Sequence, residues 1–270
     1  ALFFIGSGEV KLENISVNNN NASANGVVYA SGGTVTLNNI EATGNKASNG
    51  GILYTSGSST QVNIINNNWK GNSASNGGIL YITNATVNVT DSTFEENTAY
   101  IGGVAYIKGG VFNTTNVNFT KNSAIKRTSG SGGNGGAVSL ESGTFNVSQN
   151  DTFTENTAEN HGCAVYVSYL TNESDGSKVG GILNANGGIF SKNTAMGGGA
   201  LSLRTNASAV LNGTTLSENS VTGYADKNDG DGEGGGAIYV GYGDITLNNV
   251  TASGNTSESA GGAVNAFRST

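Results

Sequence analysis

The chain has 270 residues, 36% of them hydrophobic and 11% charged, with a formal net charge of −7. This balance argues against a nucleic-acid surface, which needs clustered Lys and Arg, and no run of about 18 apolar residues marks a membrane span. A chain with 43 Gly, 40 Asn and no Pro could be a disordered tract, but the hydrophobic residues recur in step, which predicts a folded chain.

The first recurring element is a short apolar segment that follows a pair of glycines. Residues 52–54, 79–82, 104–107 and 237–240 are examples. Aliphatic side chains alternate along them with the period of two that a strand requires. Glycine before the segment permits a positive φ or a close backbone approach. We therefore predict a tight corner that leads into a first strand.

Two more strands are predicted in each repeat. The second is seen at 34–37, 61–64, 86–89 and 244–247, where hydrophobic and polar residues alternate. The third has the pattern Phe-x-x-Asn, as at 94–97, 119–122, 153–156 and 190–193. We expect its aromatic residue to point inward and to stack on its equivalent in the next coil. The residues expected in this stack are Trp69, Phe94, Phe119, Phe153 and Phe190.

The asparagine that closes the third strand defines the repeat. Its spacing is near 25 residues, with occasional longer intervals, which indicates a solenoid. Equivalent side chains in successive coils lie about 4.8 Å apart, so their amides can hydrogen-bond along the stack. The predicted asparagine ladder consists of Asn20, Asn45, Asn72, Asn97, Asn122, Asn156, Asn193, Asn219 and Asn255.

These patterns predict an all-β fold, a right-handed single-stranded parallel β-helix of about nine coils with three short strands each. Residues 1–270 are expected to form one domain with inserts at 125–134, 168–179 and 221–234. The first and last inserts fall between a ladder asparagine and a glycine pair, so they should project from the same corner, and deletion of 226–233 should leave the fold intact. Both ends of the chain read as a first strand, so we expect a segment of a longer solenoid.

The repeat resembles the polymorphic outer-membrane protein (Pmp) repeats of autotransporter adhesins. Those repeats pair Gly-Gly-Ala-(Ile/Leu/Val) with Phe-x-x-Asn. The first motif occurs here at 135–138, 198–201, 235–238 and 261–264, and the second at 94–97, 119–122, 153–156 and 190–193. The resemblance covers essentially the whole chain, and it implies a surface or secreted β-helix of the adhesin type. Several coils depart from the pattern by reading Gly-Gly-Ile-Leu-Tyr.

Parallel β-helices also carry polysaccharide lyases and hydrolases, whose sites need converging carboxylates. Asp91 and Asp151 fall near one corner but two coils apart, so we predict no catalytic site. The segment DKNDGDGE offers Asp226, Asp229 and Asp231 as candidate Ca²⁺ ligands. Its spacing departs from an EF-hand loop, so we expect a solvated acidic loop and no cofactor, with Ca²⁺ as the alternative.

Three other features recur or cluster in a way that could form a site. His161 and Cys163 lie close in sequence, but no third group is identifiable that would orient a base, so we interpret them as corner residues. Outward tyrosines recur at Tyr29, Tyr54 and Tyr81 and beyond, which suits either ligand binding or stacking between coils. The residue before the ladder asparagine alternates in charge through Glu96, Lys121, Glu155, Lys192 and Glu218.

Asn-x-Ser/Thr sequons occur thirteen times, and eight of the nine ladder asparagines lie outside them. In a eukaryotic secreted protein such sites carry N-linked glycans. The candidates for glycosylation are Asn14, Asn21, Asn84, Asn88, Asn113, Asn118, Asn146, Asn150, Asn172, Asn206, Asn212, Asn249 and Asn255.

We therefore expect a non-catalytic extracellular or cell-surface glycoprotein, a rod or filament segment. The alternative is an adhesin stalk that binds a host or carbohydrate ligand, and a less favoured one is a polysaccharide lyase or hydrolase. The expected partners are head-to-tail copies of the chain or further coils of it, because an open β-helix end presents unpaired backbone.

Overall fold

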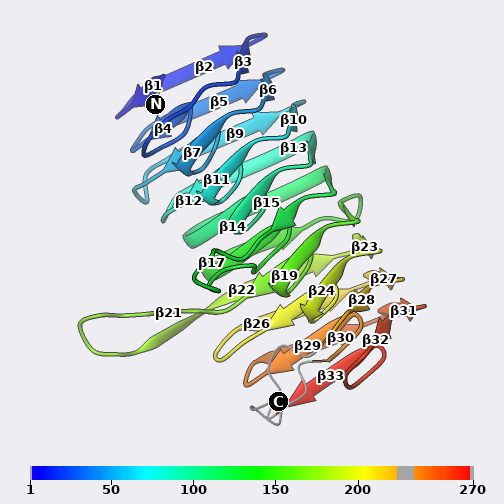
Figure 1. The fold of residues 1–270 in the computed structure, drawn as a ribbon. Coiled ribbons are helices and arrows are strands. Elements are labelled where there is room, and N and C mark those ends of the chain that lie inside the picture. The colour runs from blue at the N-terminus through cyan, green and yellow to red at the C-terminus, as the bar shows by residue number, and fades with distance from the viewer. Residues whose placement is uncertain (1, 224–233, 268–270) are drawn as a thin grey trace.

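The computed structural model describes residues 2–223 and 234–267, and within them the chain is a stack of β-strand coils (Figure 1). Strands of one class pair in parallel with the same class in the neighbouring coils, as Phe94 in one coil pairs with Phe119 in the next. Because the chain advances by one coil between paired strands, the architecture is a parallel β-helix. This confirms the predicted fold class.

From the second coil to the ninth, each coil contains four strand segments, not the three that the sequence predicts, while the first coil has three strands and only isolated bridges at Asn21 and Asn25. The first strands are β1 (Phe3–Ile5), β4 (Val28–Ala30), β8 (Leu53–Thr55), β12 (Leu80–Ile82), the start of β15 (Ala105–Thr120), the start of β17 (Val138–Val147), β20 (Val165–Val167), β25 (Leu201–Leu203), β29 (Ile238–Gly241) and β33 (Val264–Phe267).

The second and third strands form one continuous sheet with the first strands. The second strands are β2 (Glu9–Glu13), β5 (Thr34–Asn38), β9 (Gln61–Ile65), the start of β13 (Thr86–Glu95), parts of β15 and β17, β22 (Lys178–Asn186), β26 (Ser208–Asn212) and β30 (Asp244–Asn248). The third strands are β3 (Ser16–Asn18), β6 (Glu41–Thr43), β10 (Asn68–Lys70), the ends of β13 and β15, β18 (Thr152–Thr154), β23 (Ile189–Ser191), β27 (Thr215–Ser217) and β31 (Thr251–Ser253).

The fourth strand, which the sequence did not predict, follows the ladder asparagine and forms a separate parallel sheet. Its members are β7 (Lys46–Asn49), β11 (Ser73–Asn76), β14 (Thr98–Ile101), β16 (Ser123–Ala124), β19 (Thr157–His161), β24 (Thr194–Gly197), β28 (Ser220–Val221) and β32 (Thr256–Ser257). Small residues such as Ala74 and Ala99 pair across its strands. This sheet lets the coil turn back toward the next first strand.

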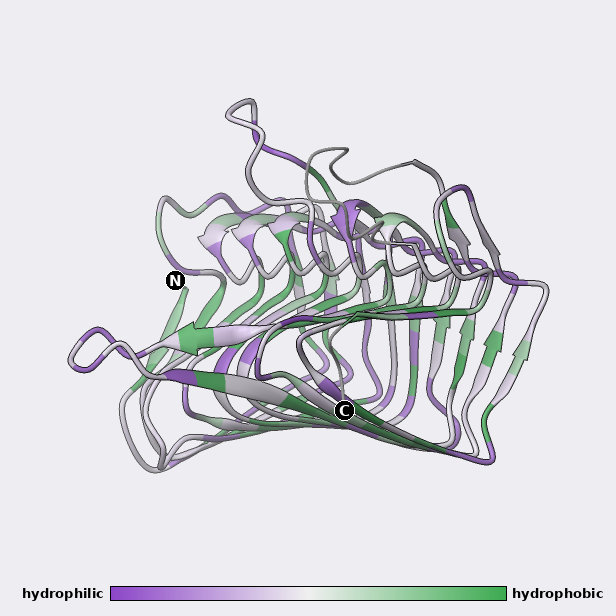
Figure 2. Cartoon of the chain, turned by 90° about the horizontal axis from the view of Figure 1, so that it is seen from below, coloured by the Kyte–Doolittle hydropathy of each residue, from purple (hydrophilic) through white to green (hydrophobic). Residues whose placement is uncertain are grey.

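The core runs the length of the stack and is filled from the inward faces of the strands. Along the second strands the inward positions are aliphatic, as with Val62 and Ile64, while the residues between them point out. Figure 2, seen from below, shows hydrophobic stretches recurring in successive coils. Because each inward residue stacks on its equivalent in the neighbouring coils, one repeated pattern builds one continuous core.

The glycine pair forms the corner between the fourth and first strands. Gly77 has a φ of +59°, and a Cβ on it would collide with the carbonyl oxygen of Leu80. A Cβ on Gly78 would meet the carbonyl of Gly103 in the next coil. The two glycines thus serve different needs, one a left-handed backbone and the other close packing between coils.

Two of the three predicted inserts lie within the described residues. Residues 125–134 connect β16 to a glycine pair and contain an antiparallel bridge between Lys126 and Gly132. Residues 168–179 form a hairpin in which β21 (Tyr169–Thr171) pairs antiparallel with the start of β22, and this hairpin projects from the stack (Figure 1). Most of the third insert, 221–234, lies outside the described residues.

Candidate functional site

The seven inner ladder asparagines, from Asn45 to Asn219, have a fully used side-chain amide. In Asn97, the backbone N–H and the Nδ2 group both donate to Oδ1 of Asn122, each at 3.0 Å. The second Nδ2 proton goes to the carbonyl of Trp69 at 3.1 Å. Oδ1 of Asn97 in turn accepts from the backbone N–H and Nδ2 of Asn72, at 2.9 and 3.1 Å. Asn suits this position because it offers two donors and two acceptor sites on one short side chain.

The same contacts repeat at every step, which confirms the predicted ladder from Asn20 to Asn255. Rungs Asn45 to Asn219 have no exposed surface. All the amides point the same way along the stack, from each coil to the next. Aligned amide dipoles in a buried setting polarise one another, so the ladder should be stronger than the sum of separate bonds.

The predicted aromatic stack is also confirmed, with every ring 0–2% exposed. Ring centroids are 5.6 Å apart between Trp69 and Phe94, whose planes are tilted by 31°, and 5.5 Å apart between Phe94 and Phe119, which meet edge to face at 65° rather than stacked. They close to 4.5 Å from Phe119 to Phe153 and 4.4 Å from Phe153 to Phe190, with the planes within 4° of parallel. The ladder and the stack together account for the Phe-x-x-Asn motif.

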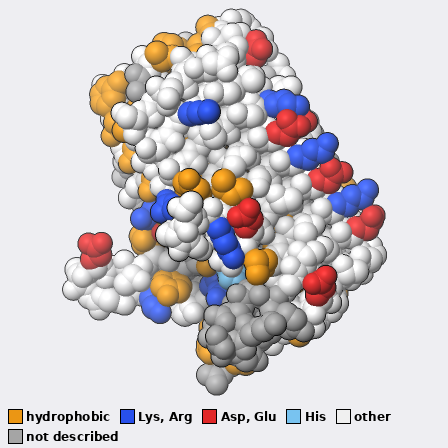
Figure 3. Space-filling view, viewed as in Figure 1, with side chains coloured by type: hydrophobic (Ala, Val, Ile, Leu, Met, Phe, Trp, Pro, Cys, Tyr) orange, Lys and Arg blue, Asp and Glu red, His pale blue; other side chains and the backbone are white. Residues whose placement is uncertain are grey.

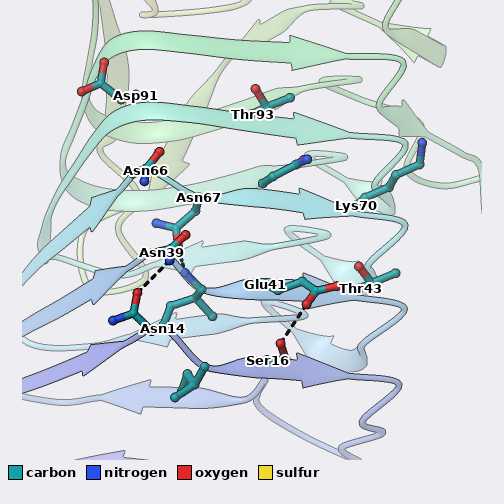
Figure 4. Close-up of a pocket in the computed structure, with 13 residues that line it drawn as sticks. Asn14, Ser16, Asn39, Glu41, Thr43, Asn66, Asn67, Lys70, Asp91 and Thr93 are labelled. Carbon is teal, nitrogen blue, oxygen red and sulfur yellow. Dashed lines mark hydrogen bonds between the residues drawn. The ribbon is translucent and has the colours of Figure 1, made fainter.

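An open polar groove of about 720 Å³ crosses the corners between the second and third strands of the first four coils (Figure 4). It was not predicted. Asn14, Asn39, Asn66 and Asp91 form one row along it, each with φ between +49° and +55°. The groove is lined by Asn14, Ile15, Ser16, Asn39, Ile40, Glu41, Thr43, Asn66, Asn67, Asn68, Lys70, Asp91 and Thr93.

Some groove side chains are held by one another and others are available to a ligand. Nδ2 of Asn39 donates to Oδ1 of Asn14 at 2.7 Å, and Ser16 Oγ donates to Glu41 at 2.8 Å (Figure 4). Asn66 and Asn68 are exposed. Amides, hydroxyls and carboxylates arranged along an open groove can hydrogen-bond sugar hydroxyls.

The carboxylates considered for catalysis are not brought together. Asp91 is exposed and accepts a 2.6 Å hydrogen bond from Nδ2 of Asn116. Asp151 is fully buried and accepts from the Thr114 hydroxyl at 2.6 Å and from the backbone N–H groups of Val117 and Ser148 at 2.8 and 2.7 Å. Its oxygens are therefore committed to tying a corner to the neighbouring coil.

The candidate Ca²⁺ ligands Asp226, Asp229 and Asp231 lie outside the described residues. Within the ranges 2–223 and 234–267, no group of three His, Cys, Asp or Glu side chains is placed to hold a metal ion.

His161 and Cys163 are both buried at the corner before β20. Burial raises the pKa of the Cys163 thiol, which accepts a 3.0 Å hydrogen bond from the backbone N–H of Thr194 and donates to the carbonyl of Asn156. Burial lowers the pKa of His161 to about 3, with smaller contributions from Arg204 and Lys126. A buried neutral thiol bonded only to backbone groups is not an activated nucleophile, which agrees with a corner role.

The outward tyrosines lie on neighbouring first strands, as predicted. Ring centroids are 5.1 Å apart at each step through Tyr29, Tyr54, Tyr81 and Tyr106. Burial raises the pKa of Tyr81 to about 12, helped by Tyr54 and then by a neighbouring carboxylate. The rings turn edges and faces to one another, so they stabilise the stack rather than form a flat exposed platform.

None of the thirteen sequon asparagines is buried. Three of them, Asn88, Asn113 and Asn146, occupy successive coils in a second, half-buried row. Their Nδ2 groups donate to the asparagine of the preceding coil at 3.1, 2.8 and 2.7 Å. Each donates one of its two Nδ2 protons, so the other remains for covalent attachment of a glycan.

Comparisons of the chain with protein-family models, with curated proteins and with solved structures gave no match. The resemblance to Pmp repeats therefore stays a prediction from the motifs. The described part of the chain contains no helix that is long and apolar enough to cross a membrane.

Proposed function

We propose that the chain is a non-catalytic structural protein, a glycosylated rod or filament segment outside the cell. The observation that carries this proposal is the ladder, which joins every coil to the next through the same buried amide contacts. A structure in which each repeat contacts only its neighbours can be lengthened without changing its cross-section. Stiffness and length, rather than a single site, are what such a repeat supplies.

The two end rungs of the ladder have side-chain groups that a partner could hydrogen-bond. Among the described residues, no donor reaches Oδ1 of Asn20, and the Nδ2 group of Asn255 donates only to the carbonyl of Leu216. A further coil at either end would complete both rungs. We therefore propose as partners further coils of the chain or a head-to-tail copy.

The strand classes distinguish these two partners. A head-to-tail copy would bring its β1 to the level already occupied by β33, so one of these strands would have to move aside. Further coils of the same chain need no such change. Electron microscopy of native material should show extended rods, and a compact particle capped by other ordered structure would contradict the proposal.

Glycosylation is tested separately from length. Enzymatic release of N-linked glycans in ¹⁸O-water, followed by peptide mass spectrometry, would mark each occupied asparagine. We expect occupancy at exposed corner sites such as Asn14, Asn150 and Asn249. Unmodified peptides at all thirteen sequons would remove glycosylation from the proposal and leave the rod unaffected.

The polar groove favours one second candidate, an adhesin stalk that binds carbohydrate. The amides of Asn66 and Asn68, which make no side-chain hydrogen bond within the described residues, lie on the outward positions on either side of buried Asn67. A glycan array should then give saturable binding that is lost in the Asn66→Ala, Asn68→Ala double variant. Asn212→Ala, an asparagine outside the groove, serves as the control. The absence of any bound glycan would leave the structural role alone.

A further inference from the structure

A row of alternating charges follows one edge of the stack. It consists of Lys70, Glu96, Lys121, Glu155, Lys192 and Glu218, one residue from each of six successive coils; we call it the charge row. Figure 3 shows alternating blue and red side chains along this edge. Its members are well exposed, with Lys121 and Glu155 side chains 53% and 46% accessible. The row is therefore available to a partner.

Five of the six residues hold an unfavourable backbone conformation. From Glu96 to Glu218 the φ angles are +54° to +55°, a left-handed region that disfavours side chains other than Asn and Asp. The same position in four other coils holds residues that tolerate it, namely Asn19, Gly44, Gly71 and Gly254. Glycine or asparagine would fit all nine coils, so the charges in the middle coils require their own explanation.

Contacts within the chain use only part of this charge, and Lys70 also lies 3.1 Å from Glu95, outside the row. Lys121 and Glu155 are 3.8 Å apart, and Lys70 and Glu96 are 3.4 Å apart. Within the described residues, no ion pair joins Lys192 to either of its neighbours in the row. Exposed pairs at such distances contribute little to stability and lose strength in salt. Lys192 and Glu218 have no ion pair within the described residues, and the pairs made by the other four row members are exposed, so the whole row remains accessible to a partner.

The order of charges makes the row complementary to itself in one orientation. It reads plus, minus, plus, minus, plus, minus from Lys70 to Glu218. When a second copy is turned end over end and laid alongside, Lys70 faces Glu218 and Lys121 faces Glu155, and all the facing pairs are opposite in charge. A parallel copy in the same register would oppose like charges throughout. We propose that the charge row is a lateral docking surface for an antiparallel second copy of this chain.

Such a contact is isologous, because each copy uses the same surface related by a two-fold axis. Exposed charge pairs set orientation and encounter rate more than affinity. The association should therefore be weak and should weaken further as salt rises from 20 to about 500 mM, since the screening length shrinks. This inference does not depend on the rod continuing beyond the described coils.

A charge swap at the centre of the row tests the orientation. Lys121→Glu alone and Glu155→Lys alone each place two like-charge pairs in the antiparallel interface. The double variant, with both changes, restores opposite charges at every facing pair. Sedimentation equilibrium at low salt should show the dissociation constant raised about tenfold in each single variant and returned to the wild-type value in the double variant.

Two outcomes would overturn the proposal. In a parallel dimer shifted by one coil, the double variant would keep two like-charge pairs and its affinity would stay low. Failure of the double variant to regain the wild-type dissociation constant would therefore exclude the antiparallel contact. A wild-type chain that shows no salt-sensitive association up to about 1 mM also excludes it. Thermal unfolding separates an effect on folding from an effect on docking. Within one chain the double variant still places like charges in neighbouring coils of the row, so its melting temperature should not return to the wild-type value even though its dissociation constant does.

Discussion

Asn122 and Asn156 are 34 residues apart in sequence, yet the backbone N–H and Nδ2 of Asn122 both lie 3.0 Å from Oδ1 of Asn156. Other rungs with similar geometry are only 25 residues apart, as between Asn97 and Asn122. The longer interval contains the insert at 125–134, which leaves the rung unchanged. Loops therefore vary at the corners while the ladder keeps its register.

Replacing one buried rung should be costly. In Asn122→Asp, a carboxylate without donors would face Oδ1 of Asn156 and the carbonyl of Phe94. We expect a loss of about 3–5 kcal/mol in the free energy of unfolding, because a charge is left buried and unpaired. Denaturant unfolding at pH 7 measures it. The control is Asn255→Asp, at a half-buried rung, which should lower the free energy of unfolding by about 1 kcal/mol. Equal losses in the two variants would show that burial of the ladder is not the cause.

The aromatic stack should carry a comparable share of stability. Phe119→Ala removes a fully buried ring that meets Phe94 edge to face and stacks on Phe153. We expect a loss of about 3–5 kcal/mol, with the lower end reached if neighbouring coils relax into the cavity. Phe4, which is 68% exposed, provides the matched control, and Phe4→Ala should change stability by about 0.5 kcal/mol or less. Similar effects of the two variants in thermal melts would contradict a stacked core.

The repeat was predictable because each coil obeys the same constraints. The inward aromatic, the ladder asparagine and the glycine pair each answer a need that recurs in every coil, so their spacing appears directly in the sequence. The fourth strand was missed because residues such as Ala74 and Ser75 are small and carry no apolar alternation. Its strand conformation follows from pairing with neighbouring coils, which local propensity does not report.

Some of the polar contacts are not revealed by sequence spacing. One apolar contact was also missed. The ring centroids of Phe112 and Phe145 are 5.0 Å apart, and both residues could have been predicted as inward positions of their second strands. Asp151 was placed at the correct corner, but its burial and its bond to Thr114 depend on a coil 37 residues earlier. The groove arises from outward side chains at Asn66 and its neighbours. Its row of Asn14, Asn39, Asn66 and Asp91 recurs at the coil spacing and could have been found in the sequence.

The glycine corner offers a test of backbone strain against packing. In Gly77→Ala the new Cβ would collide with the carbonyl of Leu80, whereas a Cβ on Gly71 would meet nothing within 4 Å. Both glycines have positive φ, +59° and +64°. Gly71→Ala should therefore lower the free energy of unfolding by about 1–2 kcal/mol, the cost of the left-handed backbone alone. Gly77→Ala should lower it clearly more. Gly71→Asn should be close to neutral, since Asn19 holds that position in another coil. Equal losses at the two glycines in urea unfolding would show that the collision is relieved elsewhere.

The stability of the fold should depend on pH through His161. Its pKa is lowered to about 3 in the folded chain by burial and then by Arg204 and Lys126, while an exposed imidazole titrates near 6.5. Between pH 6.5 and 3 the unfolded chain therefore binds a proton that the folded chain does not. The free energy of unfolding should be fully retained above pH 6.5 and should fall as the pH drops through this window, by about 3 kcal/mol at pH 4. Carboxylates titrate in the same range, so the variant His161→Asn is measured alongside, and its stability should fall less steeply from pH 6.5 to 4. Parallel curves for the two proteins would mean that the imidazole is protonated within the folded corner.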